Sequence, residues 1–187
     1  MQKSNIFILS GPSGAGEDSI IEGLKEYFPL QRIITTTTRS MRSNESQGKP
    51  YYFVSKEEFE KQLKSGNFIE HAEQYNGNLY GVTAEEIQRV KDSGKIGIWK
   101  IEYKGVKEAK KLFPEIKSIF IDAVSLEVLE KRIRRRDNVS DEYIKERMDY
   151  TKKWLQYTNL YDFKVINEDG KLNEAVKQVA EIIKNNS

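Results

Sequence analysis

Residues 11–19 have the types and spacing of a loop that binds phosphate. Gly11 and Gly16 match the glycines of the pattern G-x-x-x-x-G-K-[ST], in which backbone N–H groups turn toward an anion. Glu17 stands where that pattern has its lysine, and Asp18 where it has a magnesium-binding hydroxyl. The candidate phosphate contacts are Ser13, Gly14, Ala15, Gly16, Glu17, Asp18 and Ser19. The alternative is a strand-to-helix turn with two carboxylates at a helix N-terminus, where negative charge is favourable.

Arginines form two further groups that could bind phosphate. Arg39 and Arg42 follow a run of threonines, and Tyr51 lies beyond them. The planar guanidinium group suits a phosphate bidentately, and a tyrosine hydroxyl adds a donor. The second group could neutralise charge during phosphoryl transfer and contains Arg132, Arg134, Arg135 and Arg136, with Arg147 in the next predicted helix. Each group could instead be a solvated loop or helix face.

Lys100 is a charged residue inside the otherwise apolar run "IGIWKIEY", and Glu102 follows two residues later. Residues at i and i+2 share one face of a strand, so we expect these two side chains to lie on the same side. A buried ammonium group needs a partner or a bound anion, unless Lys100 reaches water at the strand end. His71 is expected to be structural or exposed, and Trp99 and Trp154 to be core residues.

The composition excludes several classes of protein. The chain has 187 residues, 37% hydrophobic and 32% charged, which predicts one ordinary globular domain. A net charge of +2 gives no support for nucleic-acid binding. With one histidine and no cysteine, neither a histidine-based catalytic triad nor a zinc site is expected. No signal peptide and no membrane-length apolar run are visible, so we expect a cytoplasmic protein without a membrane partner. The sequence leaves the oligomeric state open.

Strands alternating with helices must position these residues. The alternation predicts an α/β fold in which a parallel sheet is flanked by helices, typical of P-loop NTPases. The block 33–83 breaks the alternation, and Asn76-Gly77 predicts a hairpin within it. The predicted division is a core domain of residues 1–32, 84–125 and 160–187, a small β-rich insert of residues 33–83, and a helical lid with its flanking helices over residues 126–159.

Several linked motifs resemble the guanylate kinase family, P-loop nucleoside monophosphate kinases, over nearly the whole chain. "GPSGAG" is similar to that family's P-loop, and "TTTTRSMR" with "GKPYYFVS" to its S-x-T-T-R-x-x-R and G-x-x-Y-x-F-V-S segments. "FIEHAEQYNGNLYG" resembles its F-I-E-x-A segment, "KRIRRRD" its arginine-bearing lid, and "VINED" its stretch near adenine. The resemblance implies phosphoryl transfer from ATP to GMP, giving ADP and GDP, with Mg²⁺ bound to ATP.

The resemblance also implies roles for individual residues. The GMP-binding residues would be Thr35, Arg39, Arg42, Tyr51, Glu70, Tyr80, Thr83 and Glu102, with Glu70 accepting from guanine N–H groups. The ATP-binding residues would be those of the P-loop together with Asn167 near adenine. The catalytic residues that close on the transferred phosphoryl group would be Arg132, Arg136 and Arg147.

Three positions depart from the family pattern. Besides Glu17 and Asp18, the family's strand-end aspartate is Lys100 in this chain, while Glu102 keeps the second acidic position. The exchange looks reciprocal, so we expect Lys100 to supply the catalytic ammonium, Glu17 to pair with it, and Asp18 to become a metal ligand. A salt bridge in an inactive module that binds GMP or a phosphorylated protein segment would also explain the exchange. A kinase for another purine-like monophosphate is a third interpretation.

Overall fold

The computed structural model describes residues 4–43, 45–74, 76–136 and 139–187, without the side chain of Arg136. Its main sheet has five parallel strands in the order β2-β7-β1-β8-β9. These are β1 (Ile6–Ser10), β2 (Leu30–Arg32), β7 (Ile96–Lys100), β8 (Lys117–Asp122) and β9 (Phe163–Ile166). The parallel sheet flanked by helices confirms the predicted fold class. Strand β2 was not predicted, because three residues are too few to show a periodic pattern.

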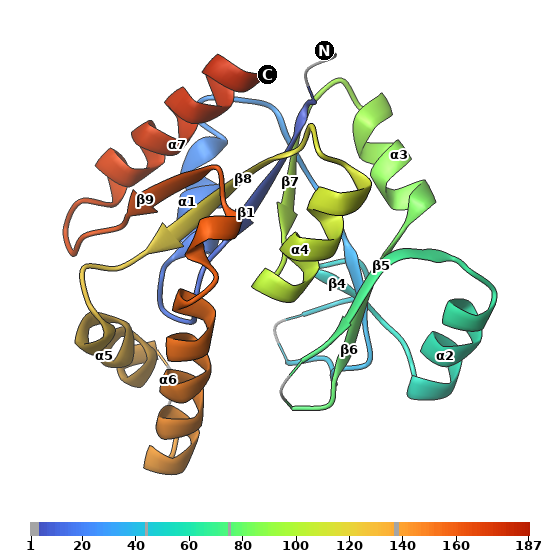
Figure 1. The fold of residues 1–187 in the computed structure, drawn as a ribbon, viewed down its shortest axis with the longest axis horizontal. Helices are drawn as coiled ribbons and strands as arrows, with labels where there is room; N and C mark the ends of the chain where they lie inside the picture. The colour runs from blue at the N-terminus through green and yellow to red at the C-terminus, as the bar shows by residue number, and fades with distance from the viewer. Residues whose placement is uncertain (1–3, 44, 75, 137–138) are drawn as a thin grey trace.

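The central strand β1 supplies both faces of the sheet with core residues, because its successive side chains point in opposite directions. Phe7 and Leu9 pack toward α1 (Glu17–Leu24) and α7 (Leu172–Asn186). Ile6 and Ile8 pack toward α3 (Ala84–Asp92) and α4 (Tyr103–Leu112). Figure 1 shows these two pairs of helices on opposite faces of the sheet. The glycine loop therefore lies between a fully buried strand and a helix that is anchored in the core.

The second sheet lies within the block that was predicted as an insert. Its four strands have the order β4-β3-β6-β5, and α2 (Lys56–Lys64) connects β4 to β5. The strands are β3 (Thr35–Thr37), β4 (Tyr51–Phe53), β5 (Phe68–Glu73) and β6 (Leu79–Thr83). Antiparallel pairing of β5 with β6 confirms the hairpin, and Gly77 supplies the positive φ of 77° in its turn.

Residues after β8 form the helices α5 (Leu126–Arg136) and α6 (Asp141–Leu155), followed by the short 3₁₀ helix η1 (Thr158–Leu160). Figure 1 places α5 and α6 on the other side of the carboxyl ends of the main sheet from the second sheet. The domain boundaries at 33–83 and 126–159 remain predictions. No helix in the described ranges is long and apolar enough to cross a membrane.

Three of the described helices, α2, α3 and α6, begin after a residue whose side chain caps the first turn. The hydroxyl of Ser55 accepts a hydrogen bond from the Glu58 N–H at 3.1 Å. The hydroxyls of Thr83 and Ser140 cap α3 and α6 in the same way. Each cap satisfies one N–H group that would otherwise have no partner in the helix.

Candidate functional site

A cleft of about 1000 Å³ lies where the carboxyl ends of the main-sheet strands face the second sheet and α5–α6. Most of the predicted site residues line it, although they are spread over the whole chain. They are Ser13, Gly14, Gly16, Glu17, Asp18, Ser19, Thr35, Arg39, Arg42, Tyr51, Glu70, Tyr80, Lys100, Glu102, Arg132, Arg147 and Asn167. This edge of a parallel sheet is where α/β folds bind ligands.

The glycine loop at one end of the cleft has its shape fixed by close packing. Gly14 and Gly16 have φ angles of 88° and 94°, which only glycine adopts without strain. A Cβ atom on Gly16 would lie 2.4 Å from the Asn167 side-chain nitrogen, which donates to the Ala15 carbonyl at 2.8 Å. Helix α1 begins directly after Gly16, and the first turn of a helix leaves its N–H groups without intrahelical partners. The loop therefore keeps the backbone form of an anion site.

Two cations hold the carboxylate of Asp18 beside this loop. Lys100 Nζ lies 2.6 Å from Asp18 Oδ2, and Arg32 Nη2 lies 3.2 Å from Asp18 Oδ1. Desolvation favours neutral Asp18, but Lys100 and Arg32 outweigh it and hold the pKa of Asp18 below its usual value. Burial likewise opposes the charge of Lys100, but Glu17 and Asp18 outweigh it and raise the Lys100 pKa. The predicted exchange of charge between loop and strand therefore forms a direct ion pair.

Lys100 interacts with both carboxylates that follow the glycine loop. Glu17 was expected to pair with it, and the charge of Glu17 contributes more than that of Asp18 to the raised Lys100 pKa, while an ion pair at 2.6 Å joins Lys100 to Asp18. Arg32 was not predicted at all. It is the last residue of β2, which the sequence did not reveal as a strand.

At the other end of the cleft, Glu45 organises the arginines after the threonine run. Arg39 Nη2 donates to both Glu45 oxygens, at 2.7 and 2.9 Å, and the Arg42 N–H donates to Glu45 at 2.8 Å. The Arg39 guanidinium lies 5.4 Å from the ring centres of both Tyr51 and Phe53. Sequence reasoning missed Glu45, although its position three residues after Arg42 in a polar loop was a usable signal. The side chains of Arg39 and its neighbours are thus ordered before any anion binds.

Glu70 is a buried carboxylate with no hydrogen-bond donor among the described residues. It is 4% exposed, and burial, with a smaller contribution from the charge of Glu108, raises its pKa to about 7. Gly105 of α4 lies beside the Glu70 carboxylate, and a Cβ atom added to Gly105 would lie 2.8 Å from Glu70 Oε1. Gly105 was not predicted, since only the folded structure brings α4 against β5. A buried carboxylate that lines a cleft without a partner can accept hydrogen bonds from a ligand.

Comparison with known proteins agrees with this arrangement. The family model described as guanylate kinase matches residues 3–186. The chain belongs to the guanylate kinase family. The guanylate kinase of Idiomarina loihiensis is 38% identical over 168 residues, 88% of this chain and 80% of that protein. The guanylate kinase of Fusobacterium nucleatum is 33% identical over 185 residues, 99% of this chain and 98% of that protein.

Solved structures confirm the fold of this guanylate kinase family member. The crystal structure of guanylate kinase from Anaplasma phagocytophilum matches with a TM-score of 0.76 at 27% identity, covering 98% of this chain and 86% of that one. Shikimate kinase from Acinetobacter baumannii matches with a TM-score of 0.53 at 13% identity, which shows a shared fold alone. The resemblance read from the sequence motifs is therefore confirmed, and the chain is a member of a family of nucleoside monophosphate kinases.

Arg132, predicted to be a lid residue, is hydrogen-bonded to the glycine loop in this structure. Its guanidinium donates to Asp169 at 2.7 Å, to the Asn167 carbonyl at 2.7 Å and to the Gly14 carbonyl at 3.1 Å. Arg147 lines the same cleft, with its guanidinium carbon 5.6 Å from the ring centre of Tyr143. The Arg136 side chain lies outside the described residues. Arg132 of α5 therefore contacts the glycine loop, and Arg147 of α6 lines the same cleft.

Glu102 lies beside Lys100 in the cleft, but the expected shared strand face is wrong. β7 ends at Lys100, and Glu102 is the N-cap residue of α4. Tyr150 of α6 donates to its carboxylate at 2.6 Å, and burial raises the Glu102 pKa. Glu102 therefore links α4 to α6 at the border of the cleft.

Two predicted site residues are not among those lining the cleft. Thr83 caps α3 through its hydroxyl, and buried Ala15 contributes a carbonyl that holds Asn167. Among residues predicted to be structural, Trp99 and Trp154 are buried and His71 is exposed. Trp154 also borders the cleft.

Proposed function

We propose that this protein transfers the terminal phosphoryl group of ATP to GMP, giving ADP and GDP. The observation that carries the proposal is the combination of Glu70 with the Arg39–Glu45 group at one end of the cleft. A buried acceptor suits the N–H groups of guanine, and the ordered arginines with Tyr51 and Tyr80 suit a monophosphate. Glu70 supports a nucleotide over a phosphorylated protein segment, because a peptide phosphate offers nothing for Glu70 to recognise.

The donor nucleotide would bind at the glycine loop, with Lys100 replacing the missing loop lysine. In the reaction a phosphate oxygen of GMP forms a bond to the terminal phosphorus of ATP, and the bond to ADP breaks. Such a transfer depends mainly on positioning and on neutralising charge. Lys100 would give up its contact with Asp18 and donate to phosphate oxygens, while Glu17 keeps the ammonium protonated. Arg132, Arg136 and Arg147 would add positive charge from the lid side.

A magnesium ion that accompanies ATP would find one suitable ligand here. The Asp18 side chain is 65% exposed, and a single carboxylate with phosphate oxygens and water is a usual set for Mg²⁺. Both Asp18 oxygens face cations in the structure, so the carboxylate accepts a metal only as Lys100 turns to the phosphates. The described residues contain no cluster of three acidic or histidine side chains for a metal. When bound, the ion would neutralise charge on the phosphates.

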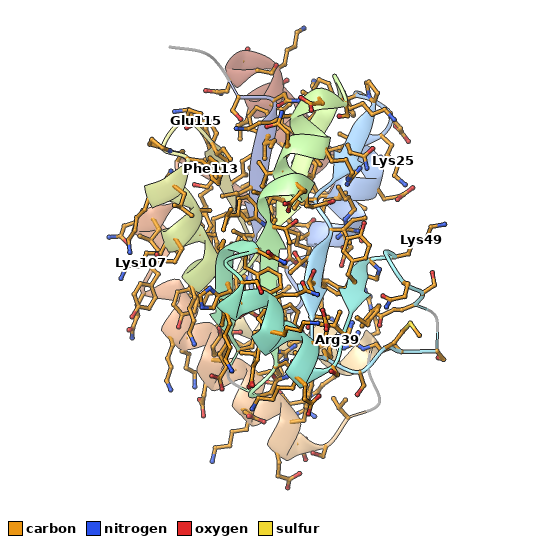
Figure 2. The ribbon with its side chains drawn as sticks, turned by 90° about the vertical axis from the view of Figure 1, so that its right-hand side faces the viewer. Lys25, Arg39, Lys49, Lys107, Phe113 and Glu115 are labelled. Carbon is orange, nitrogen blue, oxygen red and sulfur yellow. The ribbon has the colours of Figure 1, made fainter. Side chains whose placement is uncertain are left out.

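The deciding experiment measures GMP-dependent ADP formation from ATP and magnesium, with a reaction lacking GMP as control. Lys100→Ala is expected to lower turnover by at least a hundredfold and to leave GMP affinity nearly unchanged. Lys107→Ala is the matched control, because Lys107 projects from the outer side of α4 (Figure 2). Unchanged turnover in Lys100→Ala would refute the rearranged site.

The same assay separates the alternatives. No turnover with GMP, together with tight GMP binding, would favour an inactive module whose loop no longer uses ATP. Turnover with a different monophosphate in a nucleotide panel would retain the kinase and correct its substrate.

A further inference from the structure

Arg32 is a cleft-lining cation that the proposed mechanism does not use. It ends β2, which pairs in parallel with β7 so that Arg32 lies opposite Ile98. Lys100 ends β7 two residues after Ile98. Because both residues stand at the carboxyl ends of adjacent strands, their side chains reach Asp18 together, at 3.2 and 2.6 Å.

The backbone at Arg32 is held in place by an ion pair of α3 that joins the exposed Arg89 to the buried Glu86. Arg89 donates to the Arg32 carbonyl at 3.0 Å and to both carboxylate oxygens of Glu86, at 2.6 and 2.8 Å. Glu86 is 6% exposed and accepts the Ile34 N–H at 2.6 Å. The strand end that presents Arg32 is therefore rigidly positioned, unlike a long side chain on an open surface.

Glu17, Asp18, Lys100 and Arg32 form a set of four charged residues at the glycine-loop end of the cleft, and their formal charges cancel. Glu17 and Asp18 bring two negative charges, and Lys100 brings one positive charge. Without Arg32 this set has an excess negative charge beside a loop that has to bind an anion. Like charges at close range in a cleft repel strongly because solvent screening is reduced.

We propose that Arg32 is a phosphate-binding residue that works with Lys100 on the polyphosphate of the donor nucleotide. Asp18 holds both cations in the free protein. The guanidinium has five N–H donors in a planar fork, so one edge stays on Asp18 while other donors reach phosphate oxygens. This inference rests on the proposed use of the glycine loop for nucleotide phosphates.

The test measures equilibrium binding of inorganic tripolyphosphate and of ATP by calorimetry in magnesium-free buffer of low ionic strength. Arg32→Met keeps the apolar stem and is expected to weaken both affinities at least tenfold, with a shallower salt dependence. Arg32→Lys is expected to recover most of the loss. Arg134→Met is the control, because Arg134 pairs with Glu130 and Asp141 on the lid and does not line the cleft.

A double variant separates charge balance from simple loss of structure. Asp18→Asn in the Arg32→Met background removes the excess negative charge. The double variant is expected to bind tripolyphosphate at least three times more tightly than Arg32→Met alone. Asp18→Asn alone is expected to tighten tripolyphosphate binding, which tests the charge argument even if Arg32→Met fails to fold. Affinities of Arg32→Met that equal those of Arg134→Met, or a loss confined to GMP, would overturn the proposal. The assay measures binding and not turnover. A protein that binds tripolyphosphate but does not phosphorylate GMP would refute the kinase function, while the affinities would still decide the role of Arg32.

Discussion

Replacing the buried carboxylate of Glu70 with an amide should make the free protein more stable while weakening its recognition of guanine. Glu70 has a pKa of about 7 in the folded protein against the usual glutamate value of 4.5. Between these values the folded protein keeps a proton that the unfolded chain has lost, so the unfolding free energy falls as pH rises. The shift in the Glu70 pKa lowers the unfolding free energy by roughly 3 kcal/mol at pH 8 and by less than about 1 kcal/mol at pH 5.

Glu70→Gln removes this titration with little change in volume. Urea unfolding of Glu70→Gln and of the unmodified protein at pH 5 and pH 8 measures the effect. The variant is expected to gain about 3 kcal/mol at pH 8 and little at pH 5. Glu60→Gln, on the exposed side of α2, is the control for a lost charge and should show no such pH dependence. A loss of stability at pH 8 would mean that a donor already satisfies Glu70, and equal gains at both pH values would mean that its pKa is not raised.

Ligand binding gives an independent readout of the same carboxylate. If guanine N–H groups bind ionised Glu70, GMP lowers its pKa and binding near pH 7 releases protons. Calorimetry in two buffers with different ionisation enthalpies detects that release. Glu70→Gln should show none, and its GMP affinity should fall at least tenfold. A proton release that persists in the variant would assign the titration to another group.

Two further substitutions test the surroundings of the monophosphate end. Gly105→Ala places a methyl group 2.8 Å from the present position of Glu70 Oε1, so KM for GMP should rise at least fivefold. Thermal unfolding should show no loss of stability, because alanine favours the helix by up to about 1 kcal/mol. An unchanged KM would show that the Glu70 side chain adapts freely. Glu45→Gln weakens the pairing that orders Arg39, so GMP affinity should fall at least fivefold with ATP affinity unchanged; equal losses for both nucleotides would indicate a general structural defect instead.

The fold was largely predictable because its signals are local. The buried strands β1, β7 and β8 coincide with apolar runs of the sequence, and the side chains of Ser55 and Ser140 cap the first turns of α2 and α6. Strand β2 escaped because it has three residues and owes its conformation to pairing with β7. The identity of most site residues came from the family resemblance, since sequence spacing alone could not bring residues 39 and 70 to one cleft.

The parts of the site that sequence reasoning missed depend on contacts between distant elements. Arg32 reaches Asp18 only because β2 and β7 are adjacent, and Gly105 matters only because α4 packs against β5. The exchange between Lys100 and the loop was visible as opposite charges at related positions. The ion pair between Lys100 and Asp18 joins residues far apart in the sequence, so only the folded structure shows it.

The shape of the glycine loop is set by residues other than the two carboxylates that follow it. A Cβ on Gly11 would lie 2.2 Å from the Ile121 carbonyl oxygen, and one on Gly14 2.9 Å from that of Leu129. These close contacts, and the hydrogen bond from the Asn167 side chain to the Ala15 carbonyl, do not involve the side chains of residues 17 and 18. The loop conformation and its charge are therefore set by different residues. The glycine-loop backbone therefore accommodates Glu17 and Asp18, and Arg32 of β2 and Lys100 of β7 both lie against the Asp18 carboxylate.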